Sequence, residues 1–193
     1  MRLADLDLNK VYTYADYFKW NLEERVELIK GKIFAMAPAP NLLHQVITRK
    51  MIIKLGVFLE RQSCQLFSAP FDVRFPIKSK EDEDIVTVLQ PDLCVVCDTT
   101  KLDSRGCNGA PDIIVEILSP GNTTKEMNKK YEIYEEAGVK EYWIVSPLYE
   151  TILVYTLRNE KFTSERPLAT GDILHSSILP GFVLDLSELF SDN

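Results

Sequence analysis

Basic charge, long apolar runs and histidine are all scarce in this chain of 193 residues. The 22 Lys and Arg residues are outnumbered by 29 Asp and Glu residues, for a net charge of −7. This balance argues against a strongly basic nucleic-acid coat protein, because such binding needs a cationic face. It still allows an enzyme that approaches phosphates through a bound divalent cation, whose ligands are acidic side chains.

No apolar run approaches the roughly 18 residues that a membrane-spanning helix needs. The first residues, MRLADLDLNKVYTYADYF, also lack the apolar core of a signal peptide. We therefore expect no membrane association and a cytoplasmic location.

Cysteine is sparse too, with four residues at positions 64, 94, 97 and 107. Cys94 and Cys97 form a CxxC pair, but they lie in the strand-like stretch LCVVCD, where residues three apart point to opposite faces. No second CxxC and no histidine pair completes a zinc site. The sequence therefore predicts free, buried thiols.

The chain contains no internal repeat, low-complexity tract or linker, which predicts a single domain over residues 1–193. Periodicity and turn signals predict helices at 13–20, 41–61, 123–137 and 186–190. They predict strands at 25–29, 32–37, 64–69, 71–76, 85–89, 92–97, 111–118, 141–146, 151–157 and 161–165, with a loop at 98–110. This order indicates a mixed α/β (α+β) fold whose helices cover a central sheet.

An acidic residue interrupts the most apolar of these strands, PDIIVEILSP at 111–120. The neighbours of Glu116 are aliphatic on both sides, so the strand is expected to be buried on both faces. A buried carboxylate is costly unless a cation, a metal ion or several hydrogen bonds compensate it. Glu116 therefore needs a partner, and a shared divalent ion is one of the best available.

Asp92 is the first candidate partner, because it begins an apolar strand directly after Pro91. Taken alone, it is better explained as a turn or strand-start residue. The pair Pro91-Asp92, followed 24 positions later by Glu116, resembles the motif of the PD-(D/E)XK nuclease superfamily. That resemblance implies that Asp92 and Glu116 hold a metal ion and that a lysine two residues after Glu116 contacts the attacking water. Leu118 occupies the lysine position here.

A more specific resemblance covers nearly the whole chain. The segments VELIKGKIFAMAPAPNLLHQ, FDVRF, QPDLCVV, GAPDIIVEILSPGNTTKEMNKKYEIYEEAGVKEYWIVSP and ILVYTLRNEKF resemble the Uma-two family of restriction-endonuclease-like proteins. In that family the lysine lies on the next helix, in a D-x-x-x-K-x-x-x-Y pattern. The pattern maps onto Glu126, Lys130 and Tyr134, with Glu in place of Asp. Ser146 also replaces an Asp of the family's WIVDP segment.

Helical spacing gives independent support for Lys130. Met127, Tyr131 and Tyr134 are expected to form the buried stripe of helix 123–137, with Lys129 on the solvated face. Lys130 borders that stripe and can reach the sheet. The alternative is an ordinary surface pair with Glu126, worth about 0.3–0.5 kcal/mol.

Two further residues match family positions. Glu27 lies on a short strand and either faces the site, as an outer metal or water ligand, or is exposed on a hairpin. His44 precedes Gln45 at the start of the long helix and either orients a phosphate or the Glu27 carboxylate, or serves as a core or capping residue. Asp112, which also follows a proline, is expected to end the strand and not to replace Asp92.

The resemblance implies a restriction-endonuclease-like fold and a Mg²⁺-dependent (or Mn²⁺-dependent) endonuclease, which we expect to cut DNA. Asp92, Glu116 and the backbone carbonyl of Ile117 would hold the ion, and Lys130 would position water or stabilise negative charge. The alternative is a catalytically inactive nucleic-acid-binding or protein-interaction domain of the same fold. A homodimer is also expected, because the apolar strand 151–157 is expected to form an open sheet edge. The resemblance implies the same, since related nucleases often form dimers that cut both strands.

Overall fold

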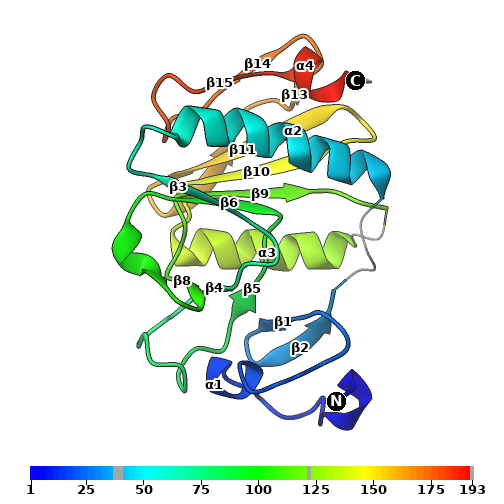
Figure 1. Ribbon diagram of the computed structural model, residues 1–193, viewed down its shortest axis with the longest axis vertical. Helices are drawn as coiled ribbons and strands as arrows, with labels where there is room; N and C mark the ends of the chain where they lie inside the picture. The colour runs from blue at the N-terminus through cyan, green and yellow to red at the C-terminus, as the bar shows by residue number, and fades with distance from the viewer. Residues whose placement is uncertain (37–40, 121–122, 192–193) are drawn as a thin grey trace.

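A mixed main sheet lies between two long helices in the computed structural model, which describes residues 1–36, 41–120 and 123–191 (Figure 1). Its six principal strands are, in spatial order, β12 (Lys161–Ser164), β11 (Thr151–Arg158), β10 (Glu141–Ser146), β9 (Ile113–Ile117), β6 (Leu93–Val96) and β3 (Gln65–Ser68). β9 and β10 are parallel, and the other neighbours are antiparallel. The expected central sheet flanked by helices is confirmed.

The two long helices, α2 (Leu42–Leu59) and α3 (Thr124–Ala137), cover opposite faces of this sheet (Figure 1). Alternation along β9 explains the two cores, because successive strand residues point to opposite faces. Val115 packs in a cluster with Ile47 and Met51 of α2, whereas Ile114 packs with Tyr134 of α3. Glu116 follows Ile114 by two residues, so its side chain points to the same face of the sheet, the one that α3 covers.

The ends of α3 follow local rules. The side chain of Thr123 accepts a hydrogen bond from the backbone N–H of Glu126, as an N-cap residue does. Gly138 ends the helix with φ of 84°, a left-handed conformation that suits glycine. Asn122, which the sequence offers as an alternative N-cap for this helix, lies outside the described residues.

A second sheet packs below the first and brings the N-terminal segment to the site. Its strands are, in spatial order, β2 (Lys32–Ala35), β1 (Val26–Ile29), β5 (Val88–Leu89), β4 (Val73–Arg74), β8 (Gly106–Asn108) and β7 (Leu102–Asp103). β1 and β2 form the expected antiparallel hairpin; Ala37, which was included in the second strand, lies outside the described residues. The short helix α1 (Tyr14–Tyr17) precedes them, and a single 3-10 turn, η1 (Leu3–Asp5), opens the chain.

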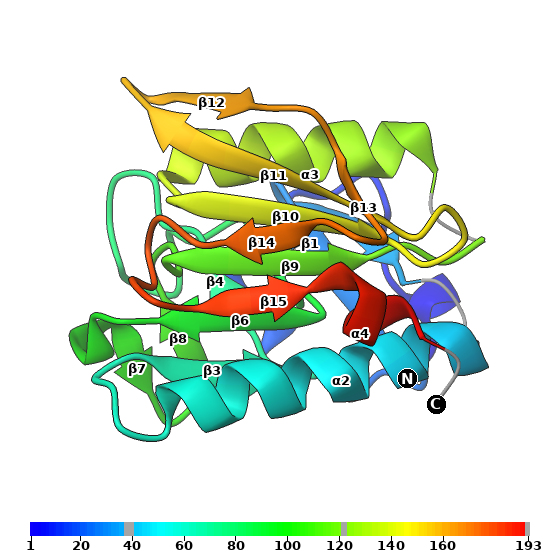
Figure 2. The same ribbon diagram turned by 90° about the horizontal axis from the view of Figure 1, so that it is seen from above.

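The C-terminal residues pack on the α2 face. β14 (Ile173–His175) and β15 (Val183–Asp185) pair with each other, and α4 (Leu186–Phe190) follows (Figure 2). Leu174, Leu184 and Leu189 join the core cluster that contains the buried residues of α2. The expected helix at 186–190 is confirmed, whereas β14 and β15 were not expected.

Two other expectations about secondary structure are wrong. The stretch 98–110 is not a plain loop: it holds a 3-10 turn, η2 (Thr99–Lys101), and the β7–β8 hairpin. The strand 151–157 is not an edge, because β11 lies between β10 and β12 and also pairs with β13 (Leu168–Ala169). The open-edge reason for expecting a homodimer is thereby removed, and the dimer itself stays a prediction.

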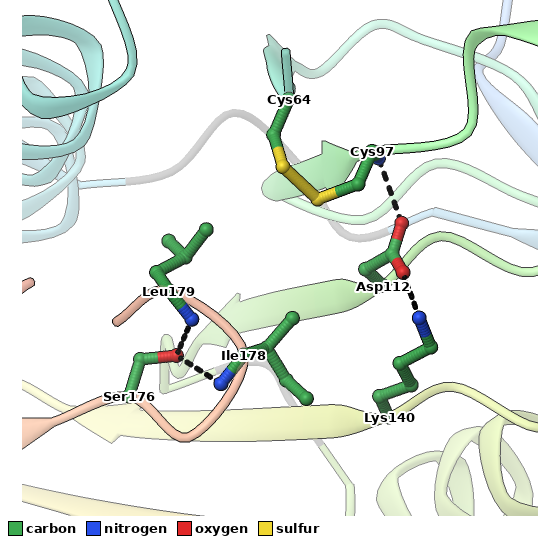
Figure 3. The surroundings of a disulfide bond; sticks show 7 residues. All are labelled: Cys64, Cys97, Asp112, Lys140, Ser176, Ile178 and Leu179. Carbon is green, nitrogen blue, oxygen red and sulfur yellow. Dashed lines mark hydrogen bonds and ion pairs between the residues drawn. A yellow bond between two sulfur atoms is a disulfide. The ribbon is translucent and has the colours of Figure 1, made fainter. Parts of the chain in front are cut away.

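The expectation of four free thiols is wrong as well. A disulfide joins Cys64 and Cys97, just beyond the paired ends of β3 and β6 (Figure 3). The antiparallel register pairs Gln65 with Val96. Cys64 directly precedes Gln65 and Cys97 directly follows Val96, so the same register brings the two cysteines face to face. Cys94 and Cys107 remain free and buried. The CxxC spacing carried no information about this bond, because Cys97 pairs across the sheet.

The carboxylate of Asp112 supports the same end of the sheet. It accepts a hydrogen bond from the backbone N–H of Cys97 (2.7 Å) and pairs with Lys140 Nζ (2.6 Å), as Figure 3 shows. Asp112 therefore has a structural role away from Asp92.

Among the described residues, no helix is both long and apolar enough to cross a membrane. The cytoplasmic location stays a prediction.

Candidate active site

A cavity of about 320 Å³ opens at one end of the main sheet. Figure 1 shows that the start of α2, the start of α3 and the C-terminal end of β9 meet at this end. Six charged side chains and one histidine line the cavity: Arg25, Glu27, His44, Asp92, Glu116, Glu126 and Lys130. All five predicted catalytic residues are in this set, so the fold brings together groups from five separate elements or their ends: β1, α2, β6, β9 and α3.

Strand register places Asp92 beside Glu116. β6 runs antiparallel to β9 with Leu93 opposite Val115. Continuing this register by one residue sets Asp92 opposite Glu116. The backbone N–H of Ile117 donates a hydrogen bond to Asp92 Oδ2 (2.8 Å), which fixes the Asp92 carboxylate at the cavity wall.

Lys130 approaches the carboxylates of Glu116 and Glu27 from helix α3. Its Nζ atom lies 3.0 Å from Glu116 Oε1 and 3.3 Å from Glu27 Oε1, with only 7% of the residue exposed. Burial lowers the pKa of Lys130, but the charges of Glu116 and Glu27 raise it more, so the pKa lies above 10.5. The ammonium therefore stays charged at neutral pH. A surface pair with Glu126, the alternative weighed from the sequence, is not what the structure shows.

Glu116 is the most perturbed acid of the site. Burial raises its pKa from 4.5 to about 7, aided by the charges of Asp92 and Glu27 and opposed by Lys130. The Tyr134 hydroxyl donates a hydrogen bond to the same oxygen, Oε1, at 2.6 Å. Burial and the charge of Glu116 hold the pKa of Tyr134 well above 10, so this hydroxyl stays a donor. The other oxygen of Glu116, Oε2, accepts no hydrogen bond from the described part of the chain.

His44 orients the Asp92 carboxylate from the first turn of α2. Its Nε2 atom lies 3.2 Å from Asp92 Oδ1, and its side chain is 7% exposed. The Thr48 hydroxyl lies 3.2 Å from the other ring nitrogen, Nδ1, and 2.8 Å from the His44 carbonyl oxygen. His44 therefore contacts Asp92, and not Glu27 as one interpretation of the sequence held.

Glu27 lies inside the site and not on an exposed hairpin face. It is 3% exposed, and its Oε1 atom accepts a hydrogen bond from the backbone N–H of Gln90 (3.0 Å). The same oxygen pairs with Lys130. The second sheet thus contributes a carboxylate that shares one ammonium with Glu116.

The donor set of the cavity fits a hard divalent cation. Asp92 and Glu116 present carboxylates from adjacent strands, and Ile117 lines the same cavity. Glu116 Oε2 accepts no hydrogen bond within the described residues. Mg²⁺ typically takes one or two carboxylates and completes its six ligands with water and phosphate oxygens. No group of three or more His, Cys, Asp or Glu residues within the described ranges forms a ready-made metal cage. A site of this kind would therefore rely on water and substrate for its remaining ligands.

The stripe on α3 differs from the one expected. Lys130, Ile133 and Tyr134 are its buried residues, so Lys130 lies in the centre of the stripe and not at its border. Lys129 is not simply solvated, because its Nζ atom lies 3.9 Å from the centroid of the Phe34 ring. The sequence pattern included Tyr134 without giving it a function, and it gave no signal for Thr48 or for the backbone contact of Gln90.

Comparison with known proteins agrees with this geometry. The sequence model of the Uma2 family, described as "Putative restriction endonuclease", matches residues 14–187. The chain therefore belongs to the Uma2 family, a family of nucleases of the restriction-endonuclease-like fold. A crystal structure of a "putative nuclease belonging to DUF820" from Anabaena variabilis superposes with a TM-score of 0.70 at 21% identity, covering 93% of this chain and 97% of that one. A search of curated proteins found no match.

Proposed function

We propose that this protein is a Mg²⁺-dependent (or Mn²⁺-dependent) endonuclease that hydrolyses phosphodiester bonds in DNA. Asp92, Glu116 and the backbone carbonyl of Ile117 would hold the ion. When bound, such an ion lowers the pKa of a coordinated water and neutralises charge on the phosphate. The carboxylates of this cavity explain how an acidic protein could bind phosphates at all.

One observation carries the proposal: the ammonium of Lys130 reaches the Glu116 carboxylate across the sheet–helix interface, at 3.0 Å. A positioned cation at this place can orient a nucleophilic water or stabilise negative charge that develops on the phosphate. Tyr134 and the backbone of Ile117 hold the two acids in position. His44 does the same for Asp92 from the other side.

A second candidate function is a nucleic-acid-binding or protein-interaction domain without catalysis. The observation that favours it is the burial of Lys130 between Glu116 and Glu27, because buried ion pairs also occur as purely structural features. In that case the fold is that of a nuclease, and the cavity binds no divalent ion.

Metal binding and cleavage together separate these candidates. Titration calorimetry with Mg²⁺ and Mn²⁺ should show binding to the native protein, and cleavage of duplex DNA, single-stranded DNA and RNA should depend on the ion. Asp92→Asn should abolish both, while the fold survives because an asparagine oxygen can still accept the Ile117 hydrogen bond. Asp84→Asn, which changes an exposed acid outside the cavity, is the matched control. A native protein that neither binds Mg²⁺ or Mn²⁺ nor cleaves any of these substrates would favour the binding domain.

A further inference from the structure

A second hollow, of about 240 Å³, adjoins the candidate active site. It lies between α1 and the start of β1, and three aromatic side chains line it: Tyr17, Phe18 and Trp20. We call it the aromatic pocket. Arg25 and Gln90 line both this pocket and the cavity that contains Lys130, so these two residues form the boundary between them.

A chain of hydrogen bonds fixes the boundary. Gln90 Nε2 donates to Asp72 Oδ1 (2.8 Å) and lies 3.3 Å from the Tyr17 hydroxyl. Because a carboxylate only accepts, this contact turns the amide oxygen of Gln90 away from Asp72. That oxygen accepts a hydrogen bond from Arg25 Nη2 at 2.6 Å. The guanidinium is thus held at a defined place between the two hollows.

The charge of Arg25 is available to a ligand. Its partner Gln90 is neutral, and no carboxylate in the described ranges forms an ion pair with it. Guanidinium groups bind phosphate oxygens through two parallel hydrogen bonds, which makes them suited to a phosphodiester backbone. A phosphate at Arg25 would lie next to the cavity in which Asp92 and Glu116 converge.

The aromatic pocket offers ring surface to a flat ligand. Phe18 is 57% exposed, although the Arg105 guanidinium lies 5.3 Å from its ring centroid. Trp20 is held by ring contacts to Tyr12 and Tyr17, with centroids 5.0 and 5.8 Å apart. Aromatic side chains next to a cation are what proteins use to bind single strands, because every base has a face that stacks.

We propose that the aromatic pocket binds an unpaired nucleobase of the polynucleotide substrate, with Arg25 on the phosphate between that base and the scissile bond. The inference rests on the proposed nuclease function for the identity of the ligand. A base inside an intact duplex is stacked on both faces and paired along one edge, so it cannot enter the pocket. The substrate is therefore a single strand, or a duplex from which one base has left the stack.

Tryptophan fluorescence tests this directly, because the chain has two tryptophans and only one is near the pocket. Trp143 is 0% exposed in the core, whereas Trp20 lines the pocket. In buffer with a chelator, at one fixed salt concentration, a single-stranded octanucleotide should quench the fluorescence saturably. An intact duplex of the same length and an abasic oligonucleotide should bind more weakly. Trp20→Phe should remove the quenching.

Phe18→Ala should weaken single-strand binding by roughly five- to a hundredfold, as expected for the loss of one base–aromatic stack. Ile77→Ala, which removes another exposed apolar side chain outside both hollows, should bind like the native protein. Equal affinity for single strand, duplex and abasic strand would overturn the inference. So would a Phe18→Ala variant that binds like Ile77→Ala.

The outcome is separable from that of the proposed function. Binding without a divalent ion needs no cleavage, so a protein that binds single strands through Phe18 but never cleaves them refutes only the nuclease proposal. A protein that cleaves with Mg²⁺, and whose kcat/KM on single strands is unchanged by Phe18→Ala, refutes only the base-binding pocket.

Discussion

Replacing Lys130 by methionine removes the one cation that two buried carboxylates share. Methionine keeps an unbranched side chain of similar length, so the change leaves little cavity. Glu116 and Glu27 lose an ammonium at 3.0 and 3.3 Å. Removing one partner of a buried ion pair typically costs about 3–5 kcal/mol. We expect the free energy of unfolding to fall by this amount at pH 8.

The loss should depend on pH. In the metal-free native protein the pKa of Glu116 is raised from 4.5 to about 7. The folded state therefore binds this proton more tightly, so native stability falls as pH rises from about 4.5 to about 7, by roughly 3 kcal/mol. At pH 5 Glu116 is largely neutral and has less need of Lys130. Lys130→Met should thus lose less stability at pH 5 than at pH 8. The raised pKa of Lys130 adds no slope there, because that stability is lost only above about pH 10.5.

Activity gives the second readout. Loss of one positioned stabiliser of transition-state charge lowers the rate by about 10²–10³. Cleavage should be measured with Mg²⁺ at a low temperature where circular dichroism shows both proteins fully folded. Lys130→Arg should recover only part of the rate, because a planar guanidinium cannot replace a compact ammonium.

Lys129→Met is the matched control. Lys129 lies over the Phe34 ring and does not line the cavity. Its loss should cost about 0.5–1 kcal/mol, the size of an exposed cation–π contact, and leave cleavage unchanged. If fully folded Lys130→Met cleaved as fast as Lys129→Met, the lysine would be structural, and the proposed catalytic function would lose its cation.

Two further predictions rest on particular contacts, and a third concerns the expected homodimer. Tyr134→Phe removes the hydroxyl that donates to Glu116 Oε1, so it should destabilise the metal-free protein at pH 8 by about 1.5–3 kcal/mol. The control is Tyr131→Phe: the native Tyr131 hydroxyl lies 3.4 Å from Glu135, and its loss should change stability by less than about 0.5 kcal/mol. Urea denaturation measures both changes. Reduction of the Cys64–Cys97 bond, which spans 33 positions, should lower stability by about 3–4 kcal/mol. Independently, thiol titration of the protein denatured without reduction should find two free thiols. A count of four free thiols would contradict the disulfide bond. The homodimer is tested by light scattering at tens of micromolar, a concentration at which weak dimers should be visible, and a monomer there would refute it.

The long periodic segments were readable from the sequence because their patterns repeat over several turns or strand pairs. The buried spacing of Ile47, Met51 and Leu55 predicted α2, and its observed ends differ from the expected ones by one or two residues. β7, β8 and β13 to β15 have two or three residues each, too few for a period to be detected. Two of them also depend on strands that are not their neighbours in the sequence, because β8 pairs with β4 and β13 pairs with β11.

The candidate site was partly readable for a different reason. A carboxylate inside an aliphatic strand is a local anomaly, so Glu116 stood out without any knowledge of the fold, and Asp92 was identified as its candidate partner. Thr48 and Gln90 carry no such anomaly, because they act through hydrogen bonds to residues that the fold brings near. The disulfide was missed because cysteine spacing along the chain says nothing about which strands lie side by side.

The place of Lys130 explains how the proposed catalytic lysine can lie on a helix and not at position 118 of the strand. Residues 116 and 118 of an extended strand point to the same face, so a lysine at 118 would share the face of Glu116. Leu118 occupies that position, and α3 covers the same face of the sheet. A lysine in the buried stripe of α3 therefore delivers its ammonium to the Glu116 carboxylate from the opposite layer. Charge stabilisation depends on where the cation lies relative to the reacting atoms, not on which element carries it. The same placement buries the lysine between two acids, so its structural and chemical effects are coupled, and only stability and rate measured on the same variant can separate them.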